Sequence, residues 1–233
     1  MPVVMDPASP LLTGDEILRF HGRFKAVGPA PRTFRLPNGG TQLASKAFAR
    51  STGLWTNGKA VFPIHMRPSD SSNSPLRIGK TYVIEGHVAG ANFMGVPNLI
   101  WTAGDERVSN LETRLHDWSR ISVSGLGTII DVRVQSSPTI TPSPLVEVTV
   151  EHIGEIRAGG IFLVRCLMGS RYAQLQPGME LLPGSRIAYK GILDGFGGDL
   201  GCMAIKVSKA TVAYDNSSFI GSERGYSPLN DLY

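Results

Sequence analysis

Residues 76–90, LRIGKTYVIEGHVAG, have a counterpart in residues 181–195, LLPGSRIAYKGILDG, at an offset of 105 residues (181 − 76). Both stretches begin with leucine and carry glycine at the same three later positions, which are Gly79, Gly86 and Gly90 in the first copy. Each has the pattern of a turn, an alternating strand with an interior glycine, and a glycine-rich loop. A glycine inside a strand marks a bend or a close backbone approach, as at the corner of a barrel. The chain therefore contains a structural repeat and is predicted to form two similar domains.

The duplication extends upstream of these stretches. The motif FHGRF around Gly22 matches VSGLG around Gly125 at an offset of 103 residues (125 − 22), so each half begins with a strand bent at glycine. Alternation of apolar and polar residues with period two predicts about five strands in each half. The expected strands cover residues 17–27, 41–50, 59–66, 81–88 and 99–103 in the first half, and 121–134, 145–152, 161–168, 186–193 and 203–212 in the second.

The segment between the halves has a helical signature. Ser109-Asn110-Leu111-Glu112 has the form of a capping box, and Leu111 is followed by apolar residues four and seven positions later. We therefore predict a short helix that joins the two domains. The predicted organisation is an N-terminal segment (1–13), a first barrel (14–108), a linker helix (109–118), a second barrel (119–214) and a C-terminal tail (215–233).

Five short strands, a glycine-bent first strand and the L-x-x-G-x-x-[YI]-x-[IY]-x-G unit resemble the OB-fold, a five-stranded Greek-key barrel. The predicted fold class is all-β, with two tandem OB-like barrels. Two such barrels joined by a helix resemble tandem-OB proteins of the replication protein A type. The resemblance implies binding of single-stranded DNA and a role in replication or repair. The chain departs from that group because it has no zinc-binding cysteines and no excess of charge in its second half.

Composition agrees with a globular β protein. Hydrophobic residues make up 42% of the 233 residues, and glycine plus proline amount to 43 (27 + 16), which favours short strands and tight turns. No apolar run is long enough to cross a membrane, and residues 1–12 lack the pattern of a secretory signal, so the expectation is an intracellular protein of the nucleus or cytoplasm. Cys166 and Cys202 have no metal-ligand spacing and are expected to be buried thiols. No cofactor or metal is predicted.

Charge is concentrated in the first half. Residues 23–80 contain ten basic residues and one acid, Asp70, a balance of +9 (10 − 1), whereas residues 118–214 contain nine basic and seven acidic residues, a balance of +2 (9 − 7). A cationic region attracts polyanions, and unpaired bases stack on aromatic side chains. Aromatic residues alternate with the basic ones in this region, so it is the predicted nucleic-acid site. Its predicted residues are Arg23, Lys25, Arg32, Phe34, Arg35, Lys46, Phe48, Arg50, Trp55, Lys59, Phe62 and Arg67.

Some of these residues also suit a structural role. Phe48 and Phe62, like Phe24, fall at strand positions that fit the core of a barrel, whereas Phe34 and Trp55 lie in turn-rich segments. The matching loop in the second half, residues 194–201, contains Asp194 and Asp199, whose charges would repel phosphate. The second barrel is therefore predicted to extend the site or to contact a protein partner, a role that also suits the C-terminal tail.

Enzyme motifs fail when their context is checked. Gly79-Lys80-Thr81 lacks the upstream glycine of a phosphate-binding loop, because that position is Ser74. The five histidines have no metal or dyad spacing. Binding without catalysis is the main prediction. A structural or assembly protein of the viral coat or scaffold type, and an enzyme whose site residues meet only in space, stay open as alternatives. So do RNA in place of DNA, and a homo-oligomer.

Overall fold

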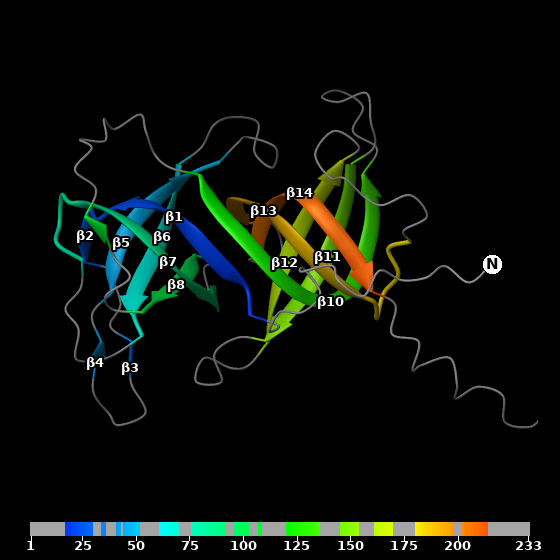
Figure 1. Cartoon of the computed structure of the whole chain (residues 1–233), viewed down its shortest axis with the longest axis horizontal. Helices are drawn as coiled ribbons and strands as arrows, with labels where there is room; N and C mark the ends of the chain where they lie inside the picture. Colours follow the sequence, from blue (N-terminus) through cyan, green and yellow to red (C-terminus); the bar gives the residue numbers. More distant parts are fainter. Residues whose placement is uncertain are drawn as a thin grey trace, which may run out of the picture.

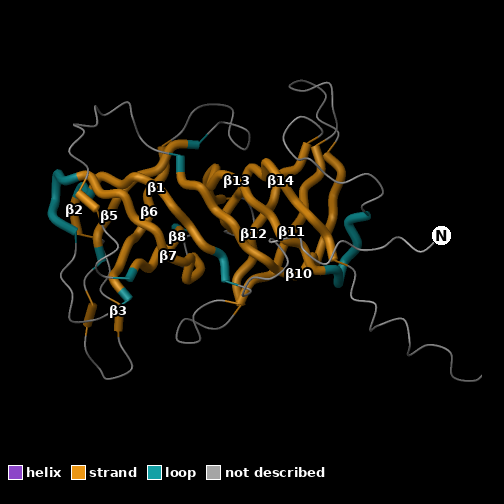
Figure 2. The backbone as a smooth tube through the Cα atoms, viewed as in Figure 1, coloured by secondary structure: helices purple, strands orange, loops and turns teal. Residues whose placement is uncertain are grey.

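The computed structural model describes residues 17–29, 34–35, 41–42, 44–51, 61–69, 76–91, 96–102, 107–108, 120–135, 145–153, 161–169, 180–197 and 202–213. Within these residues the regular structure consists of strands β1 to β14 and contains no helix, as Figure 2 shows. The predicted all-β class is confirmed. The predicted linker helix at 109–118 lies outside the described residues.

The first barrel uses five main strands. They are β1 (Arg19–Lys25), continued by β2 (Gly28–Pro29), then β5 (Ser45–Arg50), β6 (Val61–Pro68), β7 (Thr81–Ala91) and β8 (Pro97–Trp101). β1 pairs with β7, β7 with β8, β8 in parallel with β6, β6 with β5, and β5 with β2. β3 (Phe34–Arg35) and β4 (Thr41–Gln42) form a separate two-stranded ribbon, and β9 (Arg107–Val108) pairs with β7.

The second barrel repeats this order. Its strands are β10 (Ile121–Gln135), β11 (Leu145–Ile153), β12 (Ile161–Gly169), β13 (Arg186–Gly197) and β14 (Cys202–Ala213). β10 pairs with β11 and β13, β11 with β12, β12 in parallel with β14, and β14 with β13, which closes the barrel. In both halves the strands of one barrel follow the spatial order first, second, third, fifth, fourth, first. This is the strand order of the OB-fold, so the chain consists of two OB-folds in tandem, as predicted.

The repeated glycines occupy equivalent places in the two barrels. Gly79 and Gly184 have positive φ angles of 82° and 87°. Residues with a Cβ atom avoid this backbone conformation. Their N–H groups donate to the carbonyl oxygens of Ala26 and Ile129, both at 2.7 Å. These acceptors lie at the bend of each first strand, again 103 residues apart (129 − 26). The repeated spacing within the sequence therefore reflects one turn that ties the fourth strand to the bend of the first strand in both barrels.

The bend of the first strand differs between the halves. β10 continues beyond its bend through a register shift between Ile129 and Asp131. In the first half the strand stops at Lys25 and resumes only at Gly28 and Pro29. Proline has no N–H group, so Pro29 cannot donate to the ladder with β5.

The two barrels share one sheet. Arg19, Phe20 and His21 of β1 pair with β10, while the opposite edge of β1 pairs with β7. Figure 1 shows β1 and β10 side by side where the barrels meet. The rings of Phe62 and Phe196 also meet edge to face across the junction, with centroids 6.0 Å apart. The barrels are therefore joined by a backbone ladder and by apolar packing.

Buried side chains fill both barrels. Phe20, Phe24 and Trp101 are among those of the first, and Val148, Ile187 and Tyr189 among those of the second. Cys166 and Cys202 are buried free thiols, as predicted. Burial raises the pKa of Cys166, so this thiol stays protonated and packs as a small apolar group.

Candidate nucleic-acid interface

The outer face of β5 alternates cations with an aromatic ring. Buried and partly exposed residues alternate along this strand, so Ser45, Ala47 and Ala49 point into the barrel. Lys46, Phe48 and Arg50 consequently project from its outer face at every second position. In this order the two cations can contact phosphates of a single-stranded nucleic acid, and the ring between them can stack on an unpaired base.

The neighbouring strand β6 completes this face. Its residues Val61, Pro63 and His65 lie directly opposite Arg50, Phe48 and Lys46, and paired residues project from the same side of a sheet. Arg67 lies two positions beyond His65 on the same side. We call the outward side chains of β5 and β6 the β5–β6 face. In the OB-fold these are the second and third strands, the usual surface for oligonucleotides.

Lys46 interacts with two neighbours on this face. Its Nζ atom lies 5.1 Å from the centroid of the Phe48 ring, within the range of a cation–π contact. Burial, and secondly the charge of Lys46, lower the pKa of His65 below its ordinary value of 6.5. The imidazole therefore stays neutral at physiological pH, and the positive charge of this part of the face comes from Lys46.

Arg23 and Lys25 lie on β1 rather than on β5 or β6. Alternation along β1 buries Phe20, Gly22 and Phe24 and directs the residues between them outward. The outward set consists of Arg19, His21, Arg23 and Lys25. The sequence prediction included only the last two, because the basic region was counted from Arg23. The alternation R-x-H-x-R-x-K was the signal that would have found the others.

Phe62 does not reach the β5–β6 face. It is paired with Ala49, points into the protein, is 6% exposed and packs on Phe196 of the second barrel. No face of its ring is open to a base, so the structure removes Phe62 from the candidate set and gives it a packing role at the barrel junction.

The remaining predicted residues are placed only in part. Phe34 and Arg35 form β3, between the first and second strands of the first barrel, and only their backbone is described. Arg32, Trp55 and Lys59 lie outside the described residues. Their role stays a prediction.

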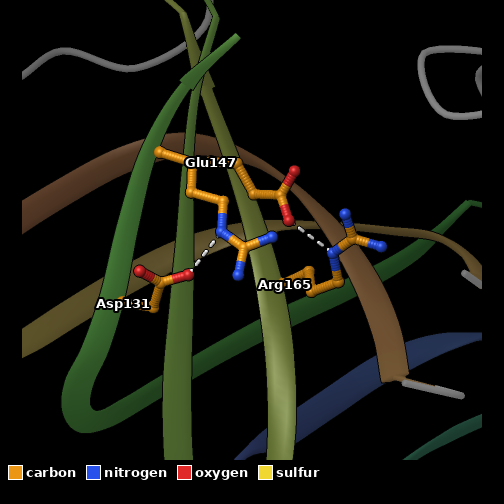
Figure 3. A network of polar contacts seen from close by, with 4 residues as sticks. Asp131, Glu147 and Arg165 are labelled. Carbon is orange, nitrogen blue, oxygen red and sulfur yellow. Dashed lines mark hydrogen bonds and ion pairs between the residues drawn. The ribbon is translucent and has the colours of Figure 1, made fainter. Parts of the chain in front are cut away.

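The corresponding face of the second barrel is electrically different. On β11 and β12, the Arg165 Nε atom donates to Glu147 Oε1 at 2.5 Å. On the adjacent strand β10, Arg133 Nε donates to Asp131 Oδ2 at 2.6 Å. Figure 3 shows both pairs on neighbouring strands. These arginine charges are balanced locally by carboxylates, which also repel phosphate. Of the two acids predicted to repel phosphate, Asp194 lies buried in β13 and accepts a hydrogen bond from Ser51 Oγ of the first barrel at 3.3 Å. Asp199 lies outside the described residues.

Other kinds of site receive no support from the part of the chain that the structure covers. Among its residues, no group of three or more histidine, cysteine, aspartate or glutamate side chains could hold a metal ion. The same residues include no helix long and apolar enough to cross a membrane.

Comparisons with known proteins give structural neighbours only. No protein-family model and no curated protein matches the sequence. A solved deletion mutant of the single-stranded DNA binding protein from Thermus aquaticus is 13% identical, with a TM-score of 0.49, over 93% of this chain and 96% of that one. The wild-type protein is 14% identical, with a TM-score of 0.46, over 84% and 91% of the two chains. Because these sequence identities and TM-scores are low, the fold assignment depends on the strand order described above and not on these neighbours.

Proposed function

We propose that the chain binds single-stranded nucleic acid, preferably DNA, through the β5–β6 face and without catalysing a reaction. The observation that carries this proposal is the alternation of Lys46, Phe48 and Arg50 on the outer side of β5. With Arg67, the two strands β5 and β6 contain three cations and no acidic residue, a balance of +3 (3 − 0). The corresponding strands β11 and β12 contain Arg165 against Glu147 and Glu151, a balance of −1 (1 − 2).

The geometry suggests how a strand is held. Phosphates lie against Lys46 and Arg50, and a base stacks on Phe48 between them. The Lys46 ammonium lies over that ring, a contact worth about 0.5–1 kcal/mol at an exposed site. Stacking of a base is worth about 1–3 kcal/mol, so moving the lysine from the ring to a phosphate leaves a net gain.

Little dependence on base sequence is expected from this face. Cations contact phosphates, and a phenylalanine ring contacts the flat surface of any base. Recognition of one base over another requires hydrogen bonds to base edges. Apart from the cations assigned to phosphates and the buried His65, the side chains of this face are those of Phe48, Val61 and Pro63, which have no donor or acceptor with which to form them.

The second barrel has a different proposed role. Its paired arginines contribute little attraction to phosphate, and the acids Asp131 and Glu147 oppose it. We infer that this barrel supports the first one and offers its outer surface to a protein partner.

A salt titration tests the proposal. Fluorescence anisotropy with labelled single-stranded DNA, single-stranded RNA and duplex DNA gives the dissociation constant at several salt concentrations. We expect both single strands to bind more tightly than the duplex, and log K to fall with log salt by about 0.7 for each phosphate contacted. Absence of binding at low salt, or an affinity independent of salt, would falsify the proposal.

A further inference from the structure

A groove with a volume of about 540 Å³ lies where the two barrels meet, away from the β5–β6 face. Both barrels line it. Arg19 and His21 of β1 and Glu85 and His87 of β7 come from the first barrel, and Ser124 of β10 and Lys190 of β13 come from the second. Its volume falls within the range of pockets that hold small organic ligands.

The sheet register places the polar residues of the groove in one row. His87 pairs with Arg19, Arg19 with Ser124, and Ser124 with Lys190. Directly paired residues project from the same side of a sheet, so these four side chains share one surface. Strands lie about 4.8 Å apart, and the row therefore spans about 14 Å, with a cation contributed by each barrel.

The balance of charge in the groove is positive. Arg19 and Lys190 contribute two positive charges and Glu85 one negative charge, a balance of +1 (2 − 1) with neutral histidines. Ser124 and its neighbour Ser122 add hydroxyl donors. Cations together with hydroxyl groups are suited to phosphate oxygens, because both donate hydrogen bonds to an anionic acceptor.

The outer face of β1 connects the groove with the β5–β6 face. Val27, two residues after Lys25, donates its N–H group to the carbonyl oxygen of Lys46 at 2.9 Å, so the end of β1 lies beside β5. From there the outward residues run back along β1 to Arg19 in the groove. Six residues of extended strand span about 20 Å. The residues along this line, Lys25, Arg23, His21 and Arg19, are all cationic or imidazole side chains.

We propose that the groove is a second phosphate-binding site, which holds a nucleic-acid strand after it leaves the β5–β6 face and follows β1. This inference rests on the proposed function. It assigns ligand contact to Arg19 and Lys190. It also gives the second barrel a direct share in binding, through the seam rather than through its own β11 and β12 strands.

The test compares oligo-dT of about 8 and about 30 nucleotides, lengths that suit one and two OB-sized sites. Arg19→Ala/Lys190→Ala should weaken binding of the long oligonucleotide by about 25-fold at 0.1 M salt and lower its salt slope by about 1.4, the values for two phosphate contacts. Binding of the short oligonucleotide should change less than about twofold, since the β5–β6 face alone holds it.

The matched control for Lys190→Ala removes one exposed cation of the second barrel that lies outside the groove. Arg133→Ala should leave both affinities close to wild type. An equal loss in this control would show an effect of net charge alone and would overturn the inference. So would wild-type affinity of the Arg19→Ala/Lys190→Ala variant for the long oligonucleotide, the result expected if the groove takes an acidic peptide instead.

Two further measurements keep the outcomes separable. Thermal unfolding establishes that the variants fold, and Lys190→Ala alone, at an exposed position, should lower the salt slope by about 0.7. If Lys46→Ala/Arg50→Ala weakens both oligonucleotides while the groove variants do not, the second site is wrong and the proposed function stands. If the wild-type protein binds neither oligonucleotide, the proposed function itself fails.

Discussion

The two barrels share a strand order and differ in what their outer faces carry. Both have the same glycine turn and the same closure, yet β5 and β6 present cations without acids, whereas β11 and β12 pair theirs with carboxylates. The residues that repeat between the barrels, such as Gly79 and Gly184, are those that the backbone geometry requires. The surface residues do not repeat. A duplicated fold therefore keeps its turns and its core while its two outer faces carry different charges.

The largest expected effect tests the equivalence of the repeated glycines. A Cβ atom at Gly86 would overlap the carbonyl oxygen of Ile100, and one at Gly191 would overlap that of Lys206. Gly86→Ala and Gly191→Ala should each lower the free energy of unfolding by about 3 kcal/mol, because a backbone carbonyl has to move. Gly28→Ala is the control, since a Cβ atom there meets nothing within 4 Å. Urea unfolding measures all three, and a stable Gly191→Ala variant beside an unstable Gly86→Ala one would contradict the equivalence.

The next effect tests the contrast between the two outer faces. Lys46→Ala/Arg50→Ala should weaken binding of single-stranded DNA by about 25-fold at 0.1 M salt, as expected for two lost phosphate contacts. Arg133→Ala should change the affinity by less than about twofold, because its charge is already balanced by Asp131. Anisotropy gives both values. Equal losses of affinity from the substitutions in the two barrels would contradict the proposed difference between their outer faces.

A smaller effect separates stacking from charge on the β5–β6 face. Phe48→Leu should lower the affinity by about fivefold, near the lower limit for one stacked base, and leave the salt slope unchanged. Phe48→Tyr keeps the aromatic ring and should retain most of the affinity. A change of the salt slope in Phe48→Leu would instead mean that the ring acts by positioning Lys46.

The smallest effect concerns pH. The pKa of His65 is lowered in the folded protein, so between that value and 6.5 the unfolded chain binds more protons than the folded one. The contribution of neutral His65 to stability is therefore complete above pH 6.5 and is lost as the pH falls. Urea unfolding at pH 7 and pH 5 should show a loss of stability on acidification that is smaller in His65→Gln. An unchanged pH dependence in this variant would contradict the assignment.

Much of the fold could be predicted from the sequence because its turns impose strict local requirements. Gly79 and Gly184 need positive φ angles, and the alternation in β7 and β13 follows directly from each turn. The ends of strands were harder to predict where a strand continues beyond the alternation of apolar and polar residues. For example, β13 continues to Gly197, four residues beyond the predicted end at Leu193.

The candidate site was harder to predict because it depends on which side of a strand faces the core. In β6, VFPIHMRP, apolar residues occupy both sides, so the sequence did not decide between Phe62 and Pro63 as the outward residue. The alternation along β1 indicates that Arg19 and His21 point outward, but only the pairing of β1 with β10 places them at the junction of the barrels. Such a contact between two domains leaves no periodic signal in either one.

The ladder between β1 and β10 fixes the angle between the barrels. Tandem domains on a flexible linker must lose orientational freedom when one ligand spans both, and part of the binding free energy is spent on that ordering. Here the loss has already occurred during folding, because three residue pairs hold the first strands together. When one polymer contacts both barrels, their relative orientation is already fixed, so the second contact does not require the domains to become ordered.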